Sequence, residues 1–314
     1  MSLLAAVQPN PHFWRFQPHP EVWLLVASLT LLSIYALKVI GPKVVPKGQP
    51  VATAAQKRWL VFGILLLWVA SDWPMHDIAE EYLFSVHMVQ HMIFTYFLPP
   101  IFLMATPEWL PRLVLGRGKA KTAFYFLAKP VPAALIFNAV LLISHAPGVV
   151  NAAVDPSVHG AVLHYSIHTA LLLTALMMWM PVCGPLPELR ISYPAQMLYL
   201  FVISIVPTVP AAWLTFADGV VYKAYATPYR LWGISATSDQ QAAGAIMKLV
   251  GGGYLWLIIT IRFFQWAKDF SDTDKAVDQA GPVHELTWEK VQQEFDAHPA
   301  PEEPRHPTGG PSQS

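Results

Sequence analysis

The stretch 82-YLFSVHMVQHMIFTYFLPPIFLMA-105 decides the fold class of this chain. It contains no Asp, Glu, Lys or Arg, and it is long enough to cross the hydrocarbon core of a bilayer as a helix. Six further apolar runs of similar character lie on either side of it. They are Glu21–Ile40, Arg58–Trp73, Val131–Ala146, His159–Met180, Pro194–Phe216 and Gln241–Trp266. The sequence therefore predicts an all-α integral membrane protein, a bundle of seven transmembrane helices.

The composition agrees with this prediction and excludes other classes. Hydrophobic residues make up 54% of the chain and charged residues 13%, against roughly 25% charged in soluble domains. The apolar runs are continuous rather than alternating, which excludes a transmembrane β-barrel. A net charge of zero gives no basic surface for nucleic acid. The single cysteine, Cys183, excludes a disulfide framework and a cysteine-only metal site within one chain.

Lys and Arg residues predict the orientation, because they concentrate in cytoplasmic loops. They are frequent after the first and third runs and occur after the fifth run and in the tail, but the links after the second and fourth runs have none. We therefore expect an extracytoplasmic N-terminal segment (residues 1–20), a seven-helix domain (21–268) and a disordered cytoplasmic tail (269–314). Within the tail, Glu285–Phe295 has the pattern of a short amphipathic helix.

Histidines gather on one side of this topology. Of twelve histidines, seven fall in the predicted outer half of the spans or at its interface, and none falls in the inner half. They are His76, His87, His91, His145, His159, His164 and His168. Ionisable groups inside a membrane span are costly, so they are candidates for function.

Two of these histidine pairs have the spacing of metal ligands on a helix. His87 and His91 are four residues apart, as are His164 and His168, so each pair shares one helical face. Two imidazoles placed in this way can bind one metal ion. The alternative is that these histidines join helices by hydrogen bonds. We favour a metal site formed by both pairs, with His76 and His145 as further candidate ligands.

Other polar and sulfur-containing residues lie at the same predicted level. Asp72 and Asp77 are candidates to hold the distal nitrogen of a metal-bound histidine, and Asp239, which opens the seventh span, is a third candidate for this supporting role. Three methionines are candidate soft ligands, although two of them point about 100° away from the neighbouring histidines on a helix. They are Met75, Met88 and Met92.

Several motifs together resemble the polytopic CtaG family of cytochrome c oxidase assembly factors. They are 85-SVHMVQHM-92 followed by Pro99–Pro100 and Thr106–Pro107, then 144-SHAP-147 with Asn151–Ala153, and 238-SDQQ-241 with Gly252–Gly253. The resemblance covers roughly residues 20–268 and not the tail. It implies a multi-pass plasma-membrane protein that helps to form active haem–copper oxidase through copper delivery, with oxidase subunits as partners. An unrelated single-span copper chaperone of the same name uses cysteines that this chain lacks.

Four functions remain open on the sequence. The favoured one is a non-catalytic copper-holding chaperone of oxidase assembly. The second is a haem b oxidoreductase with two histidines as axial ligands. The third is a metal or proton transporter, although no chain of ionisable residues continues into the inner half. The fourth is a purely structural role for the histidines. No catalytic residue is predicted, because the sequence has no nucleotide-binding loop, serine elbow or kinase signature.

Overall fold

The computed structural model describes residues 15–155, 157–226, 230–279 and 288–297, with side chains placed up to Ala276 in the third of these ranges. These residues form helices and connecting segments and contain no β-strand, which confirms the predicted all-α class for this part of the chain. The α-helices are α1 (Pro20–Tyr35), α2 (Gly41–Val44), α3 (Ala54–Ser71), α4 (Met75–Glu81), α5 (Phe84–Met92), α6 (Leu98–Ala105), α7 (Trp109–Leu115), α8 (Lys119–Leu127), α9 (Pro130–Ser144), α10 (Pro147–Ala153), α11 (Val158–Cys183), α12 (Tyr193–Ile205), α13 (Thr208–Thr215), α14 (Ala236–Ile246), α15 (Gly253–Gln279) and α16 (Trp288–Ala297).

Each predicted apolar run coincides with one of these helices or with a run of them. Five continuous helical segments of the described chain are long and apolar enough to cross a membrane. They are Pro20–Val44, Phe84–Ala105, Val158–Cys183, Tyr193–Thr215 and Ala236–Ala276. Two further spans are reached only if bent pairs count as one, α3 with α4 at 41° and α8 with α9 at 75°. The helices therefore support five to seven spans, and the count of seven and the orientation stay predictions.

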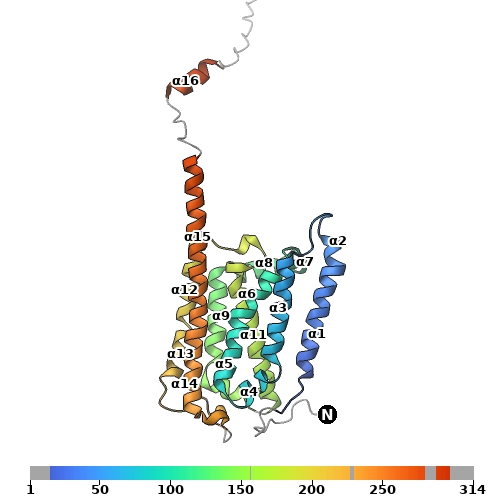
Figure 1. The fold of residues 1–314 in the computed structure, drawn as a ribbon, viewed down its shortest axis with the longest axis vertical. Coiled ribbons are helices and arrows are strands. Elements are labelled where there is room, and N and C mark those ends of the chain that lie inside the picture. The colour runs from blue at the N-terminus through green and yellow to red at the C-terminus, as the bar shows by residue number, and fades with distance from the viewer. Residues whose placement is uncertain (1–14, 156, 227–229, 280–287, 298–314) are drawn as a thin grey trace, which may run out of the picture. The chain divides into compact units, whose positions relative to one another are not determined.

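The span that carries the first histidine pair is continuous despite two prolines. Between α5 and α6 the chain makes a wider π-helical turn, Ile93–Phe97. Pro99 has no N–H to donate to the carbonyl of Thr95, four residues earlier. The indole Nε1 of Trp179 on α11 donates to that carbonyl oxygen instead, at 3.1 Å. This bond satisfies a buried acceptor and joins α11 to the α5–α6 span, which Figure 1 shows side by side.

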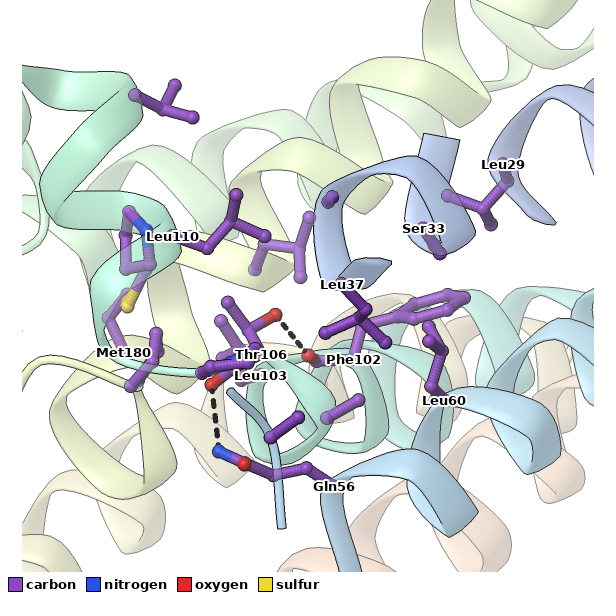
Figure 2. A pocket seen from close by; sticks show the side chains of 18 of the residues that line it. Leu29, Ser33, Leu37, Gln56, Leu60, Phe102, Leu103, Thr106, Leu110 and Met180 are labelled. Atoms are coloured by element: carbon purple, nitrogen blue, oxygen red, sulfur yellow. Dashed lines mark hydrogen bonds between the residues drawn. The ribbon is translucent and has the colours of Figure 1, made fainter. Parts of the chain in front are cut away.

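Helix α1 lies at the edge of the bundle beside α3 (Figure 1) and is mostly exposed. A cavity of about 790 Å³ separates it from α3, α6 and α11. Figure 2 shows Leu29, Leu37, Leu60 and Phe102 among the side chains that line this cavity. The lining is mostly apolar and contains no histidine, so this cavity is not the predicted metal site.

Glycines allow close helix packing at specific positions rather than throughout the Gly251–Gly253 run. A Cβ at Gly251 would lie 2.8 Å from the sulfur of Met92, whereas one at Gly253 would meet nothing within 4 Å. Gly244 on α14 is tighter, because a Cβ there would lie 2.6 Å from the backbone oxygen of Ala211 on α13. Backbone cannot move aside as a flexible side chain can, so the α13–α14 contact requires glycine at residue 244.

We expect Gly244→Ala to destabilise the protein and Gly253→Ala to leave its stability unchanged or slightly raised, because alanine favours a helix more than glycine does. Overpacking of a tight contact costs about 1–3 kcal/mol, whereas a methyl group at Gly253 enters open space. Thermal unfolding of the two variants in the same detergent measures the difference. Equal melting temperatures would contradict the close α13–α14 contact.

The described residues after the last apolar run include helical segments. The chain divides into two compact units, Met1–Trp266 and Ala267–Ser314. Helix α15 continues to Gln279, beyond the predicted boundary at Lys268, and α16 overlaps the amphipathic pattern expected at Glu285–Phe295. Extending an existing helix costs no new nucleation, so polar residues can continue it. The tail histidines His284, His298 and His306 lie outside the described residues.

Candidate metal centre

The two predicted histidine pairs face each other between α5 and α11. Within each pair the ring centroids are close, at 4.4 Å for His87 and His91 and 4.3 Å for His164 and His168. Between the helices, His91 and His168 are 4.6 Å apart, and His87 is 5.5 Å from His168. The structure thus brings together all four histidines that the spacing singled out. We call these four residues the histidine cluster.

The imidazole nitrogens of the histidine cluster fall into two overlapping donor sets. The first set has three nitrogens, one from each of His87, His91 and His168, and these three atoms lie within 4.8 Å of one another. A second set joins His164 and His168 with a carboxylate oxygen of Glu80, within the same limit. Two nitrogens bound to one ion at about 2.0–2.1 Å can be at most about 4 Å apart, so small side-chain rotations suffice to bind an ion. His168 belongs to both sets.

Several of these nitrogens are buried without a hydrogen-bond partner among the described residues. This holds for Nε2 of His91 and of His168 and, next to the cluster, for Nε2 of His145. A buried polar atom left unpaired costs about 1–3 kcal/mol. If these histidines served only to join helices by hydrogen bonds, these atoms would have partners. A metal ion would satisfy such lone pairs, so the donor set fits a bound cation.

Glu80 on α4 is the carboxylate that contacts the histidine cluster. Its Oε1 lies 3.2 Å from Nδ1 of His87 and 3.1 Å from Nε2 of His164, which is ion-pair distance without hydrogen-bond alignment. The sequence favours Asp72 and Asp77 over this residue. Glu80 precedes His87 by seven residues, which is two helical turns, but the helix breaks at Tyr82 and Leu83. That break hides the shared face from a pattern search.

The two further candidate ligands, His145 and His76, lie beside the cluster and have different hydrogen-bond partners. His145 has its ring centroid 5.9 Å from that of His91, and its Nδ1 donates to the carbonyl oxygen of Leu141 at 2.7 Å. His76 has its Nδ1 3.3 Å from the side-chain amide of Gln90 and stacks edge-on against His19. His145 therefore keeps a free Nε2 toward the cluster side of the bundle, whereas His76 belongs to a separate polar contact.

The three acidic residues predicted to orient metal-bound histidines have other partners. Asp72 accepts hydrogen bonds from the indoles of Trp23 and Trp68, at 2.9 and 2.6 Å. Asp77 accepts one from Nε2 of His19, at 2.7 Å. This bond, opposed by burial, raises the pKa of His19. These two carboxylates anchor the start of α1 to α3 and α4, so Glu80, rather than either of them, is the acidic contact of the cluster.

Asp239, the third of these acidic residues, positions the cluster from a distance. Its two carboxylate oxygens accept the backbone N–H groups of Phe84 and Ser85, at 2.9 and 3.0 Å. The first N–H groups of a helix have no partner within it, so this carboxylate on α14 caps α5. Asp239 is fully buried, and Arg230 lies 3.6 Å from it. The contact fixes the start of the helix that carries His87 and His91.

The three candidate methionine ligands differ in burial: two are buried and one is partly exposed. Met88 and Met92 are buried in the hydrophobic core with Tyr96, Phe137 and Trp179. Their position agrees with the expected divergence of about 100° from the neighbouring histidines. Met75 is partly exposed at the start of α4. His159, the remaining outer histidine, is exposed in the first turn of α11.

One comparison with known proteins covers the whole cluster. The family model described as cytochrome c oxidase caa3 assembly factor (Caa3_CtaG) matches residues 34–269. No curated protein and no solved structure matches the chain. The matched range contains Glu80, Asp239 and every histidine of the cluster, which confirms the resemblance predicted from the motifs.

Proposed function

Since the chain belongs to the cytochrome c oxidase caa3 assembly factor family, we propose that it binds copper at the histidine cluster and passes it to a haem–copper oxidase during assembly. The chain acts as a chaperone of its metal cargo and not as an enzyme. It works as a multi-pass protein of the plasma membrane. An oxidase subunit receives the copper on the extracytoplasmic side, where the Lys and Arg distribution predicts the cluster to lie.

The observation that carries this proposal is the convergence of unpartnered imidazole nitrogens. Three histidine nitrogens lie within 4.8 Å of one another, and the Nε2 atoms of His91 and His168 are buried without a partner in the described chain. Imidazole accepts copper, zinc, nickel and iron. The family's link to a haem–copper oxidase selects copper among these metals.

A carrier must also release its metal, and the ligand chemistry supports this. Thiolates hold soft Cu(I) strongly, but the only cysteine, Cys183, ends α11 at the opposite end from His164. The donors at the cluster are imidazoles and one carboxylate. Such a site binds copper without the thiolates that would make transfer to histidine ligands of an acceptor unfavourable.

The geometry favours a bare ion over haem. A porphyrin fills the four equatorial positions of its iron and leaves two axial positions for the protein. Here three or more donors from different directions share one small volume, and His168 lies within 5.5 Å of three other imidazole rings. This arrangement suits a small cation that takes three or four protein ligands.

Metal and haem analysis of the purified full-length protein tests the function. We expect copper to bind in stoichiometric amount and the protein to show no visible haem absorption. Truncation after Gln279 removes the tail histidines and is expected to leave copper content unchanged. A haem spectrum would favour the oxidoreductase, and a protein that takes up no copper under these conditions would contradict the copper carrier.

A further inference from the structure

A polar pocket lies at one end of α11, and the histidine cluster lies toward the other end of this helix. The pocket has a volume of about 390 Å³, and it is formed where the end of α11, the start of α12 and the middle of α15 meet. Arg190, Arg262 and Gln196 line it, together with Ser192 and Tyr193. We call these five residues the arginine pocket. Neither the family match nor the proposed copper function assigns it a role.

The arginine pocket carries two positive charges that no carboxylate neutralises among the described residues. In the described part of the chain, the arginines that form ion pairs are Arg112 and Arg230, which lie outside the pocket. Arg190 and Arg262 form none among these residues. Glu188, the acidic residue nearest in sequence to Arg190, pairs with Arg112 at 3.0 Å. No acidic residue lines the pocket itself. A pocket of this kind attracts an anion.

Both arginines are held in place with donors to spare. Arg190 uses its Nε to donate to the carbonyl oxygen of Gly184 at 2.6 Å. Arg262 lies over the ring of Tyr193, 5.8 Å from its centroid, and its Nη1 and Nη2 donate to Gln265 Oε1 at 2.8 Å and to the carbonyl oxygen of Val182 at 3.4 Å. Its Nε is buried without a partner in the described structure. Guanidinium groups fixed in this way match the geometry of phosphate oxygens.

Gln196 adds an acceptor to the same pocket. Its side chain is buried, with 4% of the residue exposed, and its Nε2 donates to the carbonyl oxygen of Ile191 at 2.7 Å. The remaining atom, Oε1, is buried and has no donor among the described residues. A carbonyl oxygen would repel a bare phosphate but accepts a hydrogen bond from a hydroxyl group. The pocket therefore suits an anion that carries a hydroxyl group.

The position of the pocket identifies the source of such a ligand. In the structure Cys183 ends one candidate membrane span and Tyr193 begins the next, while Arg262 lies near the end of the last apolar run. These positions share the level of lipid headgroups, on the side that the Lys and Arg distribution predicts to be cytoplasmic. Basic pockets between transmembrane helices on that side bind anionic headgroups.

We propose that the arginine pocket binds the headgroup of an anionic phospholipid with a free hydroxyl group, of which phosphatidylglycerol is the simplest example. Arg190 and Arg262 bind the phosphate, and Gln196 Oε1 accepts a hydrogen bond from the headgroup hydroxyl. The first turn of α12 faces the same site, and its positive dipole end favours the phosphate.

Native mass spectrometry of the delipidated full-length protein tests this site with three lipids of identical acyl chains. Phosphatidylglycerol should bind best, phosphatidylethanol, which has the same charge but no hydroxyl, about fivefold more weakly, and zwitterionic phosphatidylcholine weakest. Arg190→Gln and Arg262→Gln should each weaken phosphatidylglycerol binding about tenfold. Arg117→Gln, an exposed arginine outside the pocket, should have no effect.

Gln196→Met tests the hydroxyl contact, because it keeps the side-chain length and removes the acceptor. It should abolish the preference for phosphatidylglycerol over phosphatidylethanol while leaving binding of phosphatidylethanol unchanged. Circular dichroism and thermal unfolding confirm that each variant folds. Equal binding of the three lipids by the wild-type protein, or unchanged binding in the Arg190→Gln/Arg262→Gln double variant, would overturn the site. Competition by inorganic phosphate or glycerol phosphate as strong as by the lipid would overturn the lipid source.

Discussion

His168→Ala is expected to abolish most of the copper binding of the purified protein. His168 belongs to both donor sets, so its loss leaves neither set with three ligands. Loss of a residue that only hydrogen-bonds to a metal ligand lowers the affinity of the site for metal roughly 10–100-fold. Loss of a ligand that both sets share should therefore lower the copper affinity by more than about a hundredfold. Copper content after dialysis, and affinity measured by competition with a chelator, report the effect. Oxidase assembly in cells that carry the variant should fall with it.

Comparison with single variants of the other histidines distinguishes a shared centre from separate sites. His87→Ala leaves the set with Glu80, His164 and His168 intact, and His164→Ala leaves the set with His87, His91 and His168. Each should therefore lose less copper than His168→Ala. The His87→Ala/His164→Ala double variant leaves neither set with three ligands, so its loss of affinity should exceed the sum of the single losses, because the two sets share one centre and are not independent. Excess copper should partly restore the single variants by mass action.

The matched control lies on the same helix. His159 is exposed in the first turn of α11 and belongs to neither donor set, so His159→Ala should retain full copper content. Full copper content and normal oxidase assembly in the His87→Ala/His164→Ala double variant would contradict the shared centre. The cluster would then serve helix packing, and the unpartnered nitrogens of His91 and His168 would need another explanation.

The sequence predicted the apolar helices and the four cluster histidines because both depend on local patterns. Hydropathy over a span-length window identifies a helix, and residues four apart on a helix share a face whatever the surroundings. Matched depth in the predicted spans favours a site shared by the two histidine pairs. The hydrogen bond from the Trp179 indole to the Thr95 carbonyl, which joins these spans, cannot be read from the sequence.

The contacts of the acidic residues could not be predicted, because they depend on tertiary geometry. Asp77 and Glu80 are both on α4, a short helix that follows a bend of 41° after α3. On this helix Glu80 contacts the cluster and Asp77 contacts His19. The role of Asp239 as the cap of α5 joins residues 154 and 155 positions apart. No local pattern specifies such a contact.

Glu80→Gln is expected to lower the copper affinity by about 10–100-fold while leaving the protein folded. Glu80 is the only carboxylate in the donor sets found among the described residues, and the histidines are neutral when they bind metal. Its charge therefore offsets that of the buried cation, and a charge left uncompensated in a low-dielectric site is costly. Glutamine keeps the shape of the side chain and removes that charge. Chelator competition measures the affinity, and thermal unfolding without copper tests the fold.

The informative control for this variant is the carboxylate that the sequence favoured. Asp77→Asn changes an acidic residue on the same helix, but the partner of Asp77 is His19 at 2.7 Å and not a cluster histidine. If Glu80 is the acidic contact of the metal, Asp77→Asn should leave copper affinity within about twofold of the wild type, since outer contacts matter only where they touch ligands. The opposite result, with affinity lost in Asp77→Asn and kept in Glu80→Gln, would mean that the cation lies nearer His76 and His19. The copper centre would then have to be moved from the α5–α11 contact to the contact of α4 with the start of α1.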